Sequence, residues 1–219
     1  RIWIRMPNWL GDVVIALPLL RALRVSRPDA ELTVLARPQF LPLLGDLGIA
    51  DQLRALPPRG PGYFRFFRQL RREFPDVWLL FTHSLRGDLE AWLAGALQRF
   101  GIRRRGHPRP LLTHAYSAPA AYDNGTHHQL EHWENFLRHF GLAGPVDRAP
   151  FSISDAPSSP LQLIGLIPGS ENNPAKRWPV AHWRTLIESL PGERFVLFGT
   201  ANDSPIATAI AGGFDRERI

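Results

Sequence analysis

The only lysine in the chain stands in a segment whose composition suits phosphate binding. The sequence contains 26 Lys and Arg residues, and Lys176 is the single lysine among them. It lies in the segment 168–179, directly after an apolar run at 161–167. A lysine ammonium is a compact charge that can meet one phosphate oxygen. Backbone amides after Gly169, the Ser170 hydroxyl and Lys176 could together hold a diphosphate; the alternative is an ordinary loop with one exposed lysine.

A carboxylate follows the first predicted strand. The turn 8–12, with Gly11 and Asp12 at its end, comes after a strand expected at 1–6. Ligands of open parallel sheets bind at the carboxyl ends of the strands, and a glycine there allows close backbone approach. Asp12 could therefore take a proton from a bound hydroxyl. The alternative is that Asp12 only caps the following helix.

Two further groups of residues have both a chemical and a structural interpretation. Asp203 follows a strand and a small-residue turn that includes Gly199; it could accept a hydrogen bond from a ribose hydroxyl or cap a helix.

Four histidines lie close together in the sequence, namely His127, His128, His132 and His139. One pair at helical spacing falls short of the three protein ligands of a catalytic zinc site, so we interpret them as solvated helix residues and predict no metal.

Two arginine-rich segments could bind anions. The helix expected at 63–73 interleaves aromatic residues with arginines, which suits an anionic membrane surface or, more simply, a core face beside a solvated face. The loop 103–109 carries Arg103, Arg104 and Arg105 and could bind acceptor phosphates or RNA.

The order of elements predicts an α/β fold. Strands are expected at 1–6, 31–36, 52–56, 76–81, 100–102, 161–167 and 194–198. Helices are expected at 13–25, 40–44, 63–73, 84–97, 130–140, 180–190 and 205–211. Alternation of this kind is typical of parallel sheets.

Bulk composition narrows the class of protein. The 219 residues are 44% hydrophobic, include no cysteine and carry a net charge of +6. No membrane span or signal peptide is evident, so we expect a cytoplasmic protein. The charge fits nucleic acid, an anionic membrane, phosphorylated substrates or simple solubility.

We predict two domains, 1–145 and 161–219, joined by a Pro- and Ser-rich linker at 146–160. The second domain has too few strands for a doubly wound sheet. We therefore expect a C-terminally truncated sequence, which is inactive on its own.

Three segments at these positions resemble the ADP-heptose:lipopolysaccharide heptosyltransferases, glycosyltransferase family 9. They are the turn 8–12, the segment 168–179 and the stretch 197–203. The resemblance covers essentially the whole chain, and Ala-Lys-Arg-Trp-Pro at 175–179 is its most specific part.

The resemblance implies a GT-B fold, with two Rossmann-like domains facing across a cleft and the second, with its donor pocket, incomplete. It implies ADP-heptose as donor, a phosphorylated lipopolysaccharide core as acceptor, inversion at the anomeric carbon, and no cofactor or metal. Asp12 is the implied general base. The donor residues implied are Gly11, Ser170, Glu171, Asn172, Lys176, Gly199 and Asp203, and the acceptor residues are Ser84, Arg86, Arg103 and Arg105. Peripheral contact with the inner face of the inner membrane is a further expectation, and nucleic acid is not an expected partner.

Two alternatives remain open from the residues. The first is another nucleotide-sugar transferase that builds a different surface glycan. The second is a non-catalytic basic module that binds RNA or a membrane. Such a module would show strong, salt-dependent affinity without transfer, and the sequence carries no RNA-module signature.

Overall fold

The structure, a computed structural model, describes residues 1–119, 127–151, 163–170 and 173–219. The chain divides into two compact units, Arg1–Ile153 and Ser154–Ile219. Most of the predicted linker, together with Glu171 and Asn172, lies outside the described residues. Each unit is described by itself below.

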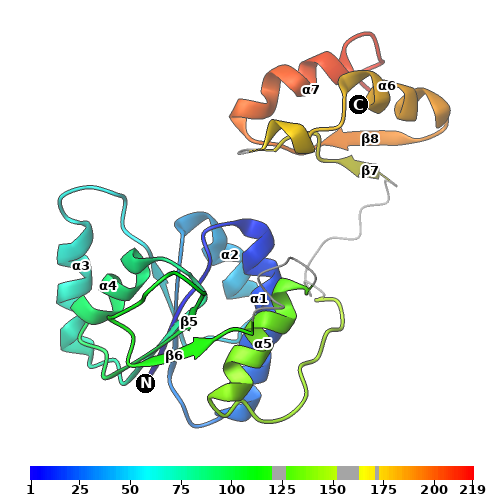
Figure 1. Cartoon of the computed structure of the whole chain (residues 1–219). Helices are drawn as coiled ribbons and strands as arrows, with labels where there is room; N and C mark the ends of the chain where they lie inside the picture. The colour runs from blue at the N-terminus through cyan, green and yellow to red at the C-terminus, as the bar shows by residue number, and fades with distance from the viewer. Residues whose placement is uncertain (120–126, 152–162, 171–172) are drawn as a thin grey trace. The chain divides into compact units, whose positions relative to one another are not determined.

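The first unit contains a parallel sheet of six strands in the order β3-β2-β1-β4-β5-β6. The strands are β1 (Ile2–Arg5), β2 (Leu32–Ala36), β3 (Gln52–Ala55), β4 (Val77–Leu80), β5 (Gln98–Arg103) and β6 (His114–Ser117). This is the order of a doubly wound sheet, in which the chain reverses direction across the sheet between β1 and β4. Figure 1 shows this sheet and its helices.

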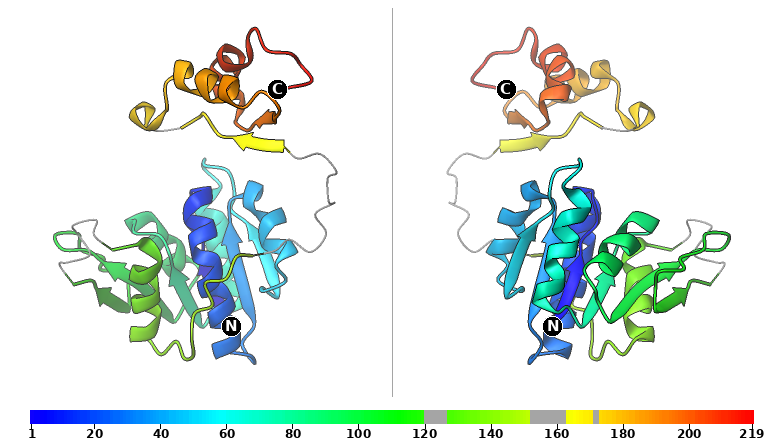
Figure 2. Two further views of the ribbon diagram at one scale, coloured as in Figure 1. Left: turned by 90° about the vertical axis from the view of Figure 1, so that its right-hand side faces the viewer. Right: turned by 90° about the vertical axis from the view of Figure 1, so that its left-hand side faces the viewer.

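Helices pack on both faces of this sheet, which Figure 2 shows from two sides. They are α1 (Leu10–Ser26), α2 (Leu41–Asp46), α3 (Tyr63–Leu70), α4 (Leu85–Leu93) and α5 (Gln129–His139). α1 and α5 pack on one face, in a core with Ile4, Val34 and Phe81. α3 and α4 pack on the other face, where Trp3 and Trp78 stack with ring centroids 5.5 Å apart. Burial of both faces explains why β2 and β4 are nearly continuous apolar runs.

The second unit pairs β7 (Leu163–Leu166) in parallel with β8 (Arg194–Leu197). Helices α6 (Val180–Ser189) and α7 (Ser204–Ala211) pack on these strands around Leu166, Ile187, Phe195 and Ile210. No helix in the described ranges is both long and apolar enough to cross a membrane.

The predicted parallel α/β fold is confirmed, with four corrections to its elements. β6 was not predicted, and β5 is longer than the strand expected at 100–102. The helix expected at 84–97 ends at Leu93, because Gly95 adopts a φ of +74° and the chain turns into β5. α1 begins at Leu10, three residues before the expected start, which places Asp12 in its first turn.

Candidate active site

The carboxyl end of the first sheet carries the candidate site. The turn after β1 and the segment after β4 meet where the strand order reverses, and this is where open α/β sheets bind ligands. A pocket of about 360 Å³ lies there, and Asp12 lines it. The first part of its wall is the turn, with Pro7, Asn8 and Trp9, and the second part is Phe81–Ser84.

Asp12 has the position and electrostatics of a proton acceptor. It is half-buried in the first turn of α1. Partial burial raises the pKa of its carboxyl above the usual aspartate range, because a low dielectric disfavours the charged form. A raised pKa makes a carboxylate a stronger base at neutral pH. Gly11, next to it, is exposed, and a Cβ there would contact nothing within 4 Å; its predicted donor role stays a prediction.

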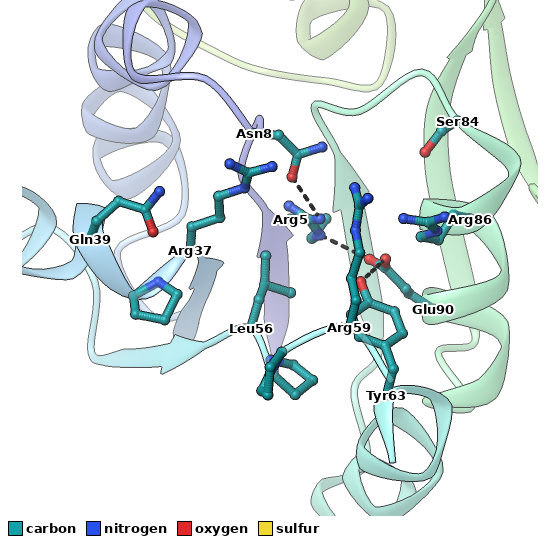
Figure 3. A pocket seen from close by; sticks show the side chains of 13 residues that line it. Arg5, Asn8, Arg37, Gln39, Leu56, Arg59, Tyr63, Ser84, Arg86 and Glu90 are labelled. Carbon is teal, nitrogen blue, oxygen red and sulfur yellow. Dashed lines mark hydrogen bonds and ion pairs between the residues drawn. The ribbon is translucent and has the colours of Figure 1, made fainter. Parts of the chain in front are cut away.

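A second, larger pocket adjoins the first one (Figure 3). Its volume is about 620 Å³, and it shares Asn8 and Ser84 with the Asp12 pocket. Four arginines line it, from the ends of β1, β2 and β3 and from α4, namely Arg5, Arg37, Arg59 and Arg86. We refer to it below as the arginine pocket.

The buried arginine of this pocket is neutralised. Arg5 Nε lies 2.8 Å from Glu90 Oε2, and both side chains are almost fully buried. Arg5 Nη2 also donates to Asn8 Oδ1 at 3.1 Å, which ties the β1–α1 turn to this pair. The Tyr63 hydroxyl donates to the same Glu90 carboxylate at 2.5 Å; burial, followed by this contact, raises the pKa of Tyr63 to about 12.

The other three arginines give the pocket its positive charge. Arg37, Arg59 and Arg86 have no carboxylate partner among the described residues, and Arg37 lies over the Trp9 ring at 5.6 Å. Three guanidinium groups around one cavity suit a ligand with several anionic groups. Arg86 was predicted; Arg37 and Arg59 were missed, because each is a single arginine at the end of a different segment.

The remaining acceptor-side predictions fall in two places. Ser84 is the N-cap of α4, where its Oγ accepts from Gly87 N at 3.3 Å, and it lines both pockets. Arg103 and Arg105 line a third pocket of about 500 Å³, and Arg104 lines both this pocket and the Asp12 pocket. The arginine loop is therefore continuous with the Asp12 pocket along the same edge of the sheet.

The predicted donor residues of the second unit follow β7 and β8. Lys176 ends a short 3₁₀ turn, Pro174–Lys176, which Asn173 caps through Ala175 N at 3.1 Å. Its side chain is exposed and forms no ion pair within the described part of the chain. Ser170 is half-buried, and its carbonyl oxygen accepts from Arg177 Nη2 at 3.0 Å. The loop thus presents a free ammonium beside a backbone held by Arg177.

Asp203 is engaged in a structural role. Its Oδ2 accepts from Thr200 N at 2.9 Å and from Thr200 Oγ1 at 2.8 Å, in a capping box. The backbone hydrogen bond from Thr200, and next the one from its hydroxyl, lower the pKa of Asp203. A Cβ on Gly169 would lie 2.4 Å from the Asp203 carboxylate, and one on Gly199 would lie 3.0 Å from Asp203 Cβ. The absence of a side chain at both glycines therefore allows the loops after β7 and β8 to pack against the Asp203 side chain.

The histidines do not form a metal centre. Within the ranges that the structure describes, no group of three or more His, Asp or Glu side chains is placed to hold a metal ion. His132 is buried in α5, and its ring lies 6.0 Å from that of His83.

Known proteins resemble this chain over nearly all of its length. The sequence profile of glycosyltransferase family 9 (heptosyltransferase) matches residues 63–218. Lipopolysaccharide heptosyltransferase 2 of Salmonella typhimurium is 29% identical over 97% of this chain and 67% of its own. The chain thus spans about two thirds of the length of that relative.

Solved structures agree with the family match. E. coli ADP-heptose lps heptosyltransferase II superposes with a TM-score of 0.75 at 25% identity, over 100% of this chain and 70% of that one. A family 9 glycosyl transferase of Veillonella parvula superposes with a TM-score of 0.82 at 20% identity, over 100% and 68% of the two chains. Because the family profile matches well over half of the residues, this chain belongs to glycosyltransferase family 9, the heptosyltransferases.

Proposed function

We propose that this protein is an inverting glycosyltransferase that moves a heptose from ADP-heptose to the inner core of lipopolysaccharide. The observation that carries the proposal is the family 9 match over residues 63–218. Relatives named lipopolysaccharide heptosyltransferase 2 support the choice of sugar and acceptor. The Asp12 pocket, at the switch point of the sheet, supports the site.

The proposed reaction is a direct displacement at the anomeric carbon of the heptose. An acceptor hydroxyl attacks that carbon while its proton passes to the Asp12 carboxylate. The bond between the anomeric carbon and the β-phosphate oxygen breaks, and its electron pair leaves with ADP. A well-placed base typically contributes about 10²–10⁴-fold in rate, and the sugar passes through an oxocarbenium-like transition state.

Lys176 acts on the leaving group in this proposal. Negative charge grows on the ADP diphosphate as the bond breaks, and an ammonium stabilises charge where it develops. The side chain of Lys176 is exposed and has no ion-pair partner among the described residues, which supports this role. Ser170 and the backbone after Gly169 and Gly199 line the same loops, while Glu171 and Asn172 are donor residues by the resemblance alone.

The acceptor is bound by arginines in this proposal. Arg86, with Arg37 and Arg59, meets one set of anionic groups in the arginine pocket, and Arg103 and Arg105 meet another in the adjoining loop. Guanidinium groups bind phosphate and carboxylate through two parallel hydrogen bonds. An inner core that carries phosphates and acidic sugars fits such a wall.

We place the protein in the cytoplasm, with peripheral contact at the inner face of the inner membrane. The net charge of +6 supports attraction to an anionic surface. The exposed Phe64 on α3, beside Arg65 and Arg68, supports contact through that helix. Co-sedimentation with anionic vesicles, lost at high salt, would agree with this placement; equal recovery with neutral vesicles would contradict it.

The test of the function is a transfer assay with a panel of donors. The enzyme is incubated with an inner-core acceptor that lacks the heptose and with ADP-heptose, or with other nucleotide sugars in parallel. We expect ADP release, and an acceptor heavier by one heptose, with ADP-heptose only. Transfer from a different nucleotide sugar would show that the enzyme uses that sugar instead of heptose. Salt-sensitive RNA binding without any transfer would favour the non-catalytic alternative.

A further inference from the structure

The wall of the Asp12 pocket contains an unusual concentration of unpaired polar atoms. Four of its lining residues have buried side-chain nitrogen or oxygen atoms that form no well-aligned hydrogen bond within the described part of the chain. They are Thr82 Oγ1, both ring nitrogens of His83, Gln129 Nε2 and Trp133 Nε1. Folded proteins pair nearly all such atoms, and an exception needs an explanation. Here the exceptions gather beside the one carboxylate that the reaction uses as base.

His83 is the most informative member because its chemistry is tightly constrained. Burial, and then the positive charges of Arg104, Arg109 and the neighbouring His132, lower its pKa to about 3. A weak interaction with the Ile102 backbone, too poorly aligned to count as a full hydrogen bond, opposes this shift. The ring is therefore neutral at any physiological pH. A neutral imidazole offers one donor and one acceptor, which matches a sugar hydroxyl better than a phosphate.

The surroundings of His83 hold it in a fixed position on the pocket wall. It follows β4, where Phe81 N still pairs with Arg5 O of β1 at 3.1 Å. The Phe81 ring packs edge-on against Trp133 of α5, with centroids 5.1 Å apart. A Cβ on Gly87 would lie 2.5 Å from Thr82 Oγ1, so α4 approaches this segment as closely as a glycine permits.

The charge beside His83 is also fixed. Arg109 forms a two-point ion pair with the fully buried Asp88, through Nε at 3.0 Å and through Nη2, and donates to Ile102 O at 2.8 Å. Both side chains of this pair are almost fully buried, so the charge of Arg109 that acts on His83 is held in place. The imidazole can rotate about its Cβ–Cγ bond at low energetic cost. A half-turn places a ring nitrogen where a ring carbon was, so the ring can present a nitrogen to a ligand in the pocket.

We propose that His83 hydrogen-bonds a hydroxyl group of the acceptor ring and so holds the attacking oxygen at Asp12. The inference rests on the proposed function, since it assigns the acceptor to this pocket. Thr82, Gln129 and Trp133 supply further groups of the same neutral kind. In this arrangement the arginine pocket selects the charge of the acceptor, and His83 sets the orientation of the ring that reacts.

The test separates acceptor binding from donor binding. The variant His83→Phe keeps a planar ring and removes both hydrogen-bonding groups, whereas His83→Gln keeps a donor and an acceptor. We expect His83→Phe to raise the KM for the acceptor about tenfold, as the loss of one well-made hydrogen bond would. The KM for ADP-heptose and the slow hydrolysis of the donor by water should not change. His83→Gln should recover much of the acceptor affinity.

The matched control is His139→Phe, which makes the same change at an exposed position on the last turn of α5. Thermal melts of all variants show that they fold. An unchanged acceptor KM in folded His83→Phe would overturn the inference, and so would equal rises in both KM values, which indicate general damage. If the wild-type protein transfers no heptose while still binding the acceptor, the proposed function fails instead, and that outcome is visible without any variant.

Discussion

The two compact units hold their charged groups in different ways. In the first unit, the pairs Arg109–Asp88 and Arg5–Glu90 are almost completely buried. In the second unit, Arg177 lies 3.9 Å from Asp203 and remains about one third exposed, with Lys176 exposed beside it. Buried pairs fix geometry but leave a costly charge when broken, whereas exposed groups can move to meet a ligand. The proposed acceptor side is therefore preorganised, whereas the proposed donor loop can adjust to its ligand.

The largest effect should come from breaking a buried pair in the first unit. Arg109→Ala leaves the carboxylate of Asp88 buried and unpaired, so we expect a loss of about 3–5 kcal/mol of unfolding free energy. Denaturant unfolding measures it. Arg105→Ala, an exposed arginine of the same loop, should change stability by less than about 0.5 kcal/mol. Similar losses in both variants would mean that the pair does not organise the site.

Removing the free ammonium of the second unit should affect binding and leave folding intact. Lys176→Ala should weaken ADP binding by about 10- to 100-fold, because a hydrogen bond to a charged group contributes roughly 1.5–3 kcal/mol. Calorimetric titration with ADP measures this change. Arg194→Ala, at the opposite end of β8, is the matched control and should bind ADP normally. An unchanged ADP affinity in Lys176→Ala would remove this residue from the donor site.

The half-buried His83, whose ring nitrogens are shielded from solvent, should make the first unit sensitive to acid. Its pKa is about 3 in the folded protein and about 6.5 in an unfolded chain, so the unfolded state binds the additional proton. Stability therefore rises with pH across this window and falls by about 1.4 kcal/mol per pH unit on acidification. Between pH 6.5 and pH 5 this amounts to roughly 2 kcal/mol.

His83→Phe should remove that part of the pH dependence, and His139→Phe should keep it. Urea unfolding at several pH values measures the difference. Parallel pH curves for the wild-type protein and His83→Phe would show that this imidazole is not held neutral by its surroundings.

The smallest effect should come from the Arg177–Asp203 pair of the second unit, in which the arginine is about one third exposed. Arg177→Gln removes the interaction with Asp203 but should cost less than about 1 kcal/mol, as partly exposed ion pairs do. Thr200 continues to satisfy the Asp203 carboxylate through two hydrogen bonds. Thermal melts compare this variant with Arg109→Ala, and a larger loss for Arg177→Gln would reverse the contrast between the units.

The sequence was sufficient to predict elements with a strong periodic signal. Continuous apolar runs indicated β2 and β4, and the alternation of strands and helices indicated a parallel sheet. It missed β6, whose four residues, His114–Ser117, are only half-buried or exposed at the sheet edge and have no apolar pattern. It also extended α4 too far, because a positive φ at Gly95 is a backbone property that the residue type only permits.

Residues of the candidate site could be predicted only where a single short segment of the sequence indicates their role. Asp12 follows the first strand, so the sheet rule was enough to propose it, whereas Ser84 and Arg86 were proposed from the resemblance to family 9. The arginine pocket draws Arg37 and Arg59 from separate segments, and their convergence depends on the order of the strands. Likewise His83 is one histidine after a strand in the sequence, and its importance comes from the neutral, unpaired state that the fold imposes.

The most direct test of the account is the rate of heptose transfer by Asp12→Asn beside its affinity for ADP. The amide keeps the shape of the side chain but cannot accept the proton. We predict a turnover lower by about 10²–10⁴-fold, with the dissociation constant for ADP unchanged. Turnover near that of the wild-type protein would contradict the account, since the attacking hydroxyl would then lose its proton to another group.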